Sequence, residues 1–300
     1  MGVVTMINFH KYGFLDVRKL QSFVHGKNLW HHRYNPVWLF IWSDLYKPEI
    51  AFTNEYIFIR YYMPDLGMCY YPPFSEKADM LKGIEMLKED AKENGFDFYI
   101  APIGEAYQFK FDDMRIKYYI NEQFNSYIYN AMDIALLSNI KYKKKRNLYE
   151  TFERNNKTAY FKNVVKEDFP MILEFINDYN ALNQENGLDQ TFYSKLNMIN
   201  KTMEHLYELD IYAIELVSDE KVVGLAFGSM MDNEICLHLC IARNDYKGAI
   251  DFLFSSFAKT VQAAVKYINF EEDFGIKDIK KFKEGYNPSR IEKFFGTFNI

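Results

Sequence analysis

The pattern of apolar and polar positions changes its period along the second half of the chain, and these changes predict an α/β unit. Thr158 to Val165 predicts a strand, and Asp168 then opens a helical pattern with Pro170 in its first turn. Apolar residues at three- and four-residue steps predict a second helix over Asp189 to Leu209. After it we expect three strands joined by short turns, a helix, a strand, a helix and an aromatic segment: Ile211 to Val217, Val222 to Met231, Glu234 to Ala242, Ala249 to Lys266, Tyr267 to Phe270, Ile276 to Tyr286 and Phe294 to Ile300.

The first half repeats this order. Two helical patterns precede three strands, a helix, a strand, a short helix and a strand: Asp16 to His25, Asn35 to Leu45, Glu49 to Phe52, Tyr56 to Tyr62, Gly67 to Tyr71, Glu76 to Asn94, Phe96 to Ala101, Gly104 to Phe109 and Arg115 to Ile120. The shared order is that of the GNAT-type N-acyltransferase fold. We therefore expect an α/β (α+β) protein of two tandem GNAT-like domains, each a mixed, mostly antiparallel sheet flanked by helices.

The segment between the halves predicts a helical connection. Ala131 to Leu137 has a helical pattern, and Lys141 to Glu153 predicts a basic helix that becomes acidic toward its end. No stretch rich in Pro, Gly or Ser separates the halves. We expect an N-terminal domain over 1–140, a connecting basic helix over 141–156 and a C-terminal domain over 157–300.

Composition supports two hydrophobic cores and restricts the possible partners. The chain has 300 residues, of which 49% are hydrophobic and 18% aromatic, enough apolar surface for two domains of ordinary size. The formal net charge of -5 argues against a surface devoted to nucleic acid or to anionic membrane. Any contact of that kind must come from a local patch.

Cysteine usage and hydropathy indicate a cytoplasmic protein. The three cysteines are too few for a disulfide framework in a chain of this length, and no secretory leader is evident. The longest apolar run, Val37 to Trp42, is far shorter than the roughly 20 residues that cross a bilayer. We expect a protein without a transmembrane segment that is cytoplasmic or, at most, peripheral to a membrane.

Three motifs resemble the phosphatidylglycerol lysyltransferase C-terminal domain family, formerly a domain of unknown function. Lys143-Lys144-Lys145-Arg146-Asn147, followed by Phe152 and Glu153, resembles its basic helix. Asn269 to Gly275 is similar to its Asn-x-Glu-x-Asp-x-Gly motif, and Lys283 to Pro288 to its Lys-x-x-Tyr-x-Pro motif. Order and spacing agree, and the resemblance covers most of the chain.

The resemblance implies two GNAT-like domains and transfer chemistry. The best-known members move an aminoacyl group from a charged tRNA to a lipid head group, whereas many others are free-standing chains of unknown substrate. Two positions depart from the family pattern: Leu239 and Cys240 follow His238 where the family has Glu-Lys, and Phe270 stands where it often has arginine. The substrate is therefore expected to differ from that of the lipid enzymes, or activity to be lost.

The acidic cluster after the late strand is the first candidate site. In a GNAT-like domain the acceptor amine and the acyl donor meet where this strand ends and separates from its neighbour. Glu271 or Asp273 would act there as a base or as a clamp on the ammonium, and Asn269 would bind substrate. The alternative is that these acids only cap the helix that begins near Ile276.

Gly248 and the mid-chain basic segment are candidate phosphate-binding groups. Gly248 precedes the long helix where GNAT enzymes bind a pyrophosphate, but the usual Arg/Gln-x-x-Gly-x-Gly/Ala spacing is absent, so an ordinary tight loop is the alternative. The family match points to Lys145, Arg146 and Asn147 as contacts to phosphates of tRNA, coenzyme A or lipid. A solvated helix face balanced by acidic residues would explain the same charges.

The remaining candidates lie on the central strand and the last helix. The spacing of Cys236, His238 and Cys240 places them on one strand face and suits soft metal ligands, but no fourth ligand is near, so we expect no metal. His238 is placed in the cleft by the family resemblance. Lys283 and Tyr286 share a helical face; they either reach the donor, with Tyr286 similar to the general-acid tyrosine of some GNAT enzymes, or pack under the last strand.

These observations predict an acyl- or aminoacyltransferase that joins a group carried by aminoacyl-tRNA or acyl-CoA to an amine or hydroxyl acceptor, such as a small molecule, lipid or peptide. Direct attack is expected, because no Gly-x-Ser-x-Gly nucleophile motif is present. The alternative is a non-catalytic binding protein that retains the cleft. The transferase prediction assumes that the basic mid-chain groups and the late acids converge on one cavity. The oligomeric state cannot be inferred.

Overall fold

The computed structural model describes residues 7–27, 31–64, 66–184 and 192–297. Contacts divide the chain into two compact units, Met1–Asn125 with Glu292–Ile300 (unit 1) and Ser126–Ile291 (unit 2). The start of the helix expected over Asp189 to Leu209 and the last residues after Thr297 lie outside the described ranges.

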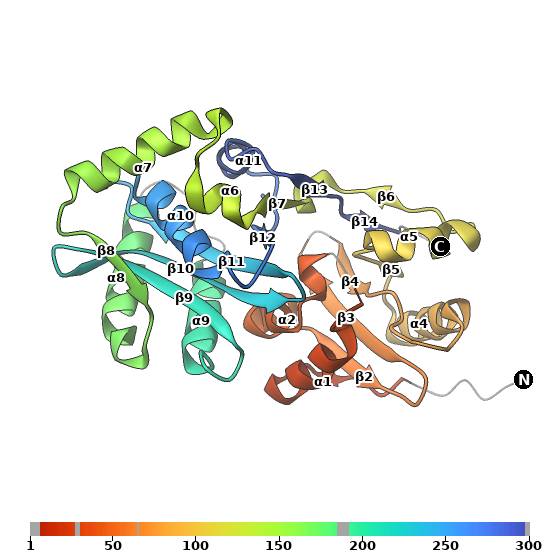
Figure 1. Cartoon of the computed structure of the whole chain (residues 1–300). Helices are drawn as coiled ribbons and strands as arrows, with labels where there is room; N and C mark the ends of the chain where they lie inside the picture. Colours follow the sequence, from red (N-terminus) through yellow and green to blue (C-terminus); the bar gives the residue numbers. More distant parts are fainter. Residues whose placement is uncertain (1–6, 28–30, 65, 185–191, 298–300) are drawn as a thin grey trace, which may run out of the picture. The chain divides into compact units, whose positions relative to one another are not determined.

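Unit 1 contains a five-stranded sheet in the order β1-β2-β3-β4-β5 (Figure 1). Its described strands are β1 (His10–Lys11), β2 (Glu49–Phe52), β3 (Ile57–Met63), β4 (Gly67–Tyr70) and β5 (Tyr99–Ile100), with β6 (Tyr119–Ile120) paired separately to β14 (Phe295–Gly296). Its described helices are α1 (Phe14–Val24), α2 (Pro36–Ile41), α3 (Ser43–Tyr46), α4 (Met80–Asn94) and α5 (Glu105–Asp113). Among the described strands of this sheet, only β4 and β5 pair in parallel, so the sheet is mixed and mostly antiparallel.

Local chemistry explains where the unit 1 helices begin. The Asn35 side chain accepts hydrogen bonds from the backbone N–H groups of Val37 and Trp38, and proline occupies the first turn of α2. The Asp79 side chain accepts from Leu81 N–H at 2.8 Å, so α4 begins at Met80 and not at the expected Glu76. Gly95, with φ of 71°, ends α4 in the left-handed conformation.

Unit 2 contains a seven-stranded sheet in the order β13-β7-β12-β11-β10-β9-β8. Its described strands are β7 (Ser126–Asn130), β8 (Tyr160–Asn163), β9 (Ile211–Ser218), β10 (Lys221–Met231), β11 (Glu234–Ala242), β12 (Tyr267–Asn269) and β13 (Arg290–Glu292). Its described helices are α6 (Ala131–Leu136), α7 (Lys143–Asn155), α8 (Phe169–Gln184), α9 (Phe192–Glu204), α10 (Ala249–Val261) and α11 (Lys277–Glu284). β11 and β12 are parallel, whereas β8 to β11 form an antiparallel meander.

The helices of unit 2 cover both faces of its sheet. Figure 1 shows α10 with α6 and α7 on one face, and α8 and α9 on the other. The core beneath α10 includes Phe254 and Phe257 of that helix, Phe152 of α7 and Phe270, which follows β12. The fold class expected from the sequence, α/β with mixed sheets flanked by helices, is confirmed.

The division into units differs from the expected domain boundaries at 140 and 157. β7 pairs with β12 through Tyr267 and Asn130, which draws the segment after Asn125 into unit 2. At the other end of the chain, the Thr297 hydroxyl accepts a hydrogen bond from Ile100 N–H at 2.9 Å, and β14 pairs with β6. The C-terminal residues therefore belong to unit 1, because their backbone groups bond to its strands.

Candidate active site

Parallel strands β11 and β12 separate after a short paired region. The pairing runs from Glu234 opposite Tyr267 to Cys236 opposite Asn269. β12 ends there, whereas β11 continues to Ala242. The chain after Asn269 thus leaves its neighbour at the point where the GNAT-like fold was expected to place the transfer site.

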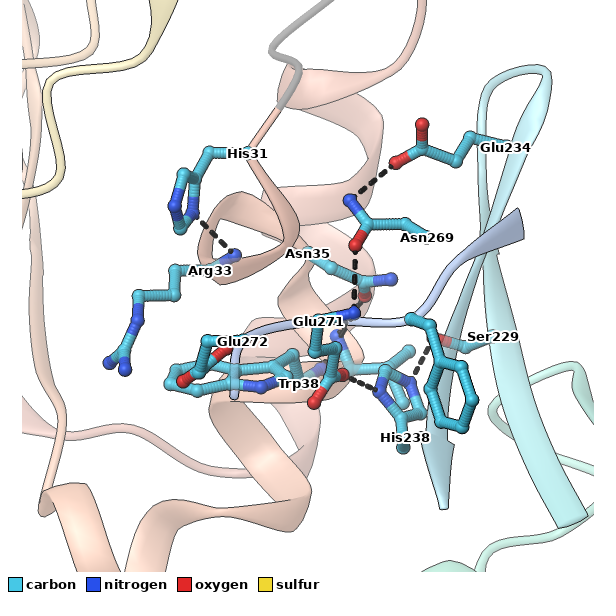
Figure 2. A network of polar contacts seen from close by, with 12 residues as sticks. His31, Arg33, Asn35, Trp38, Ser229, Glu234, His238, Asn269, Glu271 and Glu272 are labelled. Carbon is cyan, nitrogen blue, oxygen red and sulfur yellow. Dashed lines mark hydrogen bonds and ion pairs between the residues drawn. The ribbon is translucent and has the colours of Figure 1, made fainter. Parts of the chain in front are cut away.

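A β-bulge lies on β11 directly beyond this separation. Phe227 of β10 pairs with Leu239, but the next residue, Gly228, pairs with Leu237, so His238 is the extra residue between them. A bulge redirects the side chain that it contains. The imidazole of His238 is directed to two partners: Nε2 lies 2.8 Å from Ser229 Oγ, and Nδ1 lies 2.7 Å from Glu271 Oε1 (Figure 2).

Glu271 is held in an unusual backbone conformation by Asn269. The φ angle of Glu271 is 52°, in the left-handed region that non-glycine residues rarely adopt. Its N–H donates to Asn269 Oδ1 at 3.0 Å, and Asn269 Nδ2 donates to Glu234 Oε1 at 2.9 Å. Figure 2 shows these three residues in one chain of contacts. The Asn-x-Glu spacing therefore positions the glutamate, because the asparagine side chain closes the turn that presents it.

Glu234 is the buried anchor of this chain. Burial raises the pKa of its carboxyl group to about 7, while the hydrogen bond from Asn269 and the charge of Arg290 act in the opposite direction. Arg290 lies 3.7 Å from its Oε2. Ser229 and Glu234 were not among the residues expected from the sequence, since neither belongs to a recognisable motif.

The two side chains of the pair differ in their exposure. A carboxylate only accepts hydrogen bonds, so its contact with Nδ1 is one that the Nδ1–H tautomer of His238 makes. The side chain of His238 is 0% exposed, whereas that of Glu271 is 9% exposed. The carboxylate is thus the outer end of the Ser229–His238–Glu271 chain.

Asp273 has partners that serve the backbone. Tyr127 donates its hydroxyl proton to Asp273 Oδ2 at 2.5 Å, and Gly275 N–H donates to Oδ1 at 2.7 Å. The Asp273 carbonyl also accepts from Ile276 N–H at 3.0 Å. These bonds fix the turn that enters α11, which is the capping alternative considered for this residue.

Lys283 braces the same turn from α11. Its ammonium donates to the carbonyl oxygens of Phe270 and Glu272, the latter at 2.7 Å. Burial lowers the pKa of Lys283 to about 8, against the raising effect of the three carboxylates of residues 271–273. The structure therefore places Lys283 behind the acidic segment, in contact with its backbone.

Tyr286 and Lys145 meet at a different carboxylate. The Tyr286 hydroxyl donates to Asp251 Oδ1 at 2.6 Å, and Lys145 Nζ lies 3.3 Å from the same oxygen. The Lys145 ammonium is also 4.0 Å from the centroid of the Tyr286 ring. Tyr286 is fully buried, and burial raises its pKa well above the ordinary value. This cluster joins α7, α10 and the end of α11, and no motif in the sequence pointed to Asp251.

The candidate phosphate site at Gly248 is covered by α7. Gly248 has φ of 85° and precedes α10. A Cβ atom there would lie 2.1 Å from the Leu148 carbonyl oxygen and 3.3 Å from Phe152 Cβ. Because glycine has no side chain, the backbone of α7 packs directly against Gly248. The backbone at Gly248 is therefore not open to a pyrophosphate.

The other basic candidates have separate roles. Arg146 donates to the carbonyl oxygens of Leu137 and Ser138 at 2.5 and 3.1 Å, which fixes the end of α6. Asn147 is exposed on α7. The candidate residues were expected at one cavity, but they form two separate groups. Glu271, His238 and Asn269 lie together, whereas Lys145 and Tyr286 contact Asp251 in the core beneath α10.

The bulge also corrects the expected alternation of Cys236, His238 and Cys240. An extra residue at His238 shifts the side chains that follow it by one position relative to the sheet. Cys240 packs against the core beneath α10, where burial and, to a lesser extent, the charge of Asp251 raise its pKa. Cys236 and Cys240 therefore do not share a face.

Two units, each with a mixed sheet flanked by helices, define a protein of the tandem GNAT-like fold class. The sequence matches the family described as phosphatidylglycerol lysyltransferase, C-terminal, over residues 28–296. The chain belongs to this family. A comparison with curated proteins gives no match.

Solved structures agree with this assignment at the level of fold. A conserved protein of unknown function from Bacteroides thetaiotaomicron VPI-5482 has a TM-score of 0.89 and 19% identity, covering 98% of this chain and 100% of that chain. L-PGS from Bacillus licheniformis has a TM-score of 0.67 and 14% identity, with coverage of 97% and 93%. FemX has a TM-score of 0.58 and 8% identity, with coverage of 97% of both chains. Among the described residues, we find no helix with the length and apolarity needed to cross a bilayer.

Proposed function

We propose that this protein is an acyltransferase that moves a carrier-bound aminoacyl group directly onto an amine or hydroxyl acceptor, with Glu271 as the general base. The observation that carries the proposal is the position of the Glu271 carboxylate. It lies beyond the end of β12, where β11 and β12 separate, and His238 holds it from the bulge on β11.

The chemistry requires a group that accepts one proton. The acceptor nitrogen or oxygen attacks the carbonyl carbon of the carrier ester and loses a proton to Glu271. The ester C–O bond then breaks, Glu271 returns this proton to the carrier oxygen, and the carrier leaves as its free hydroxyl. His238 orients the carboxylate, as in the carboxylate–imidazole pairs of other acid–base sites. Ser229 fixes the far side of the imidazole, and Asn269 fixes the turn.

The other candidate residues support this arrangement. We assign Asp273 and Lys283 to the turn that follows Glu271, because their bonds are to its backbone and to Tyr127. We assign Tyr286 and Lys145 to the packing of α7 and α11 around Asp251. Only Glu271 among these residues both belongs to the strand separation and ends a hydrogen-bonded chain.

Aminoacyl-tRNA is favoured over acyl-CoA as the donor. The helix N-terminus where GNAT enzymes hold a pyrophosphate is covered here, since the Leu148 carbonyl oxygen approaches Gly248. The relatives' names agree with an aminoacyl donor, because phosphatidylglycerol lysyltransferase denotes transfer of a lysyl group to a lipid. The acceptor is an amine or a hydroxyl of a small molecule, lipid or peptide.

A binding protein without turnover is the second candidate. The observation that favours it is the complete burial of the His238 side chain, which suits a rigid binding wall as well as a catalytic support. The two candidates differ in whether a donor is consumed.

The test is incubation of the purified chain with aminoacyl-tRNA pools or acyl-CoA pools, each with mixed amine and lipid acceptors. Transfer from aminoacyl-tRNA that Glu271→Gln abolishes would support the proposal. Transfer from acyl-CoA alone would contradict the donor assignment. Donor retention without transfer, unchanged in the Glu271 variant, would favour the binding protein.

A further inference from the structure

Helix α6 and the turn into α7 expose aliphatic side chains at regular intervals. Met132, Leu136 and Ile140 are 53%, 57% and 76% exposed. Their spacing of four residues places Met132 and Leu136 on one face of α6, and Ile140 follows in the turn. The opposite face, which includes Ile134 and Ala135, is buried against α10.

Exposed lysines adjoin this aliphatic row. Lys143 and Lys144 open α7 and are exposed, and the Lys141 side chain is 39% exposed. The adjacent carboxylate of Asp133 is 3.5 Å from Lys141 Nζ, so its charge is offset. This ion pair joins the turn to α6, and Figure 1 shows the chain turning back from α6 into α7. We use the name α6–α7 corner for the three aliphatic residues and the three lysines: Met132, Leu136, Ile140, Lys141, Lys143 and Lys144.

The corner is held in shape by its own hydrogen bonds. The Arg146 guanidinium donates to the carbonyl oxygens of Leu137 and Ser138, and the Tyr142 hydroxyl donates to Asp133 Oδ2 at 3.4 Å. The exposure of the aliphatic row is therefore a property of an ordered segment. Exposed aliphatic side chains beside lysines are the composition of a surface that enters the interface of an anionic bilayer.

We propose that the α6–α7 corner docks unit 2 on an anionic lipid surface, with the aliphatic row among the acyl chains and the lysines at the phosphates. A nucleic acid would pair with the lysines but leave the aliphatic row in water. A bilayer accommodates both, because its interface is apolar beneath and negative above. The overall charge of -5 does not oppose this, since attraction within a Debye length depends on the local patch.

The inference is tested by co-sedimentation with vesicles of equimolar phosphatidylglycerol and phosphatidylcholine, against pure phosphatidylcholine. The wild-type chain should pellet with the anionic vesicles only. Leu136→Asp with Ile140→Asp should weaken binding at least about tenfold, and so should Lys143→Glu with Lys144→Glu. The second pair of changes keeps the test valid if the first disturbs folding.

Matched controls place the same changes elsewhere. Leu15 is 87% exposed, and Lys92 and Lys117 are exposed; Leu15→Asp and the pair Lys92→Glu with Lys117→Glu should leave vesicle binding unchanged. Equal loss in the controls, absence of wild-type binding, or retention of RNA in place of vesicles would overturn the inference. Pelleting without vesicles would overturn it too, by identifying self-association. None of these variants changes the proposed site, so loss of docking and loss of transfer are separate results.

Discussion

Nδ1 of His238 lies 2.7 Å from Oε1 of Glu271, and this contact links the bulge on β11 to the residue just beyond the end of β12. It joins two strands at the point where their own hydrogen bonds stop. A carboxylate so held has little freedom to rotate, which is the property that a base for direct acyl transfer needs.

The contact of Gly248 with α7 predicts a large effect of one methyl group. Gly248→Ala adds a Cβ that meets the Leu148 carbonyl oxygen and imposes a left-handed φ on alanine. We expect the free energy of unfolding to fall by about 3 kcal/mol, measured by urea denaturation. Gly67 has a similar φ of 82° but nothing within 4 Å of its Cβ position, so Gly67→Ala should cost only about 1 kcal/mol. Equal losses would show that α7 does not cover Gly248.

The buried ammonium of Lys283 predicts a dependence of stability on pH. Its pKa is lowered to about 8 from 10.5, so between these values the unfolded state binds more protons than the folded state. The free energy of unfolding should therefore rise with pH across this window, by up to about 3 kcal/mol. The Lys283→Met variant has no titrating ammonium at this position, so the difference between the two pH profiles gives the contribution of Lys283 to the free energy of unfolding. Parallel pH profiles of the two proteins would contradict the burial of a titrating Lys283.

The hydroxyl of Tyr286 is expected to stabilise the fold and not to take part in transfer. Tyr286→Phe removes the hydrogen bond to Asp251 and leaves this buried carboxylate with the ion pair to Lys145, at a cost of about 1 to 3 kcal/mol. Urea denaturation measures this loss, with Tyr160→Phe, at a 52% exposed position, as the control. A variant that keeps its stability but loses transfer would instead identify Tyr286 as the general acid.

The sequence predicted the order of elements well because their apolar periods are regular. The meander β9 to β11 was expected within a residue or two, since buried positions and short turns mark its ends. Unit 2 begins at Ser126, earlier in the chain than the expected connecting helix, because β7 belongs to its sheet. β7 is only five residues long, and it is defined by its pairing with β12, which is distant in sequence. No local signal distinguishes such a strand from a connection.

The candidate site was only partly predictable for a related reason. The motif residues Asn269 and Glu271 were found from their spacing, whereas Ser229 and Glu234 act through contacts that only the folded sheet creates. Lys145 was expected beside the late acids, but its partner is Asp251 on α10. The prediction assumed that side chains alternate regularly along the strand. The bulge at His238 breaks this alternation, and no sequence pattern there indicates it.

The most direct test of the central claim is a single-turnover measurement of aminoacyl transfer by the wild-type chain, Glu271→Gln and Glu284→Gln. The glutamine keeps the size of Glu271 but cannot take a proton, so transfer should fall by about a hundredfold or more. Glu284 is exposed at the end of α11, and its variant should keep the wild-type rate. A Glu271→Gln protein that transfers as fast as the Glu284→Gln control would contradict the assignment of Glu271 as the base.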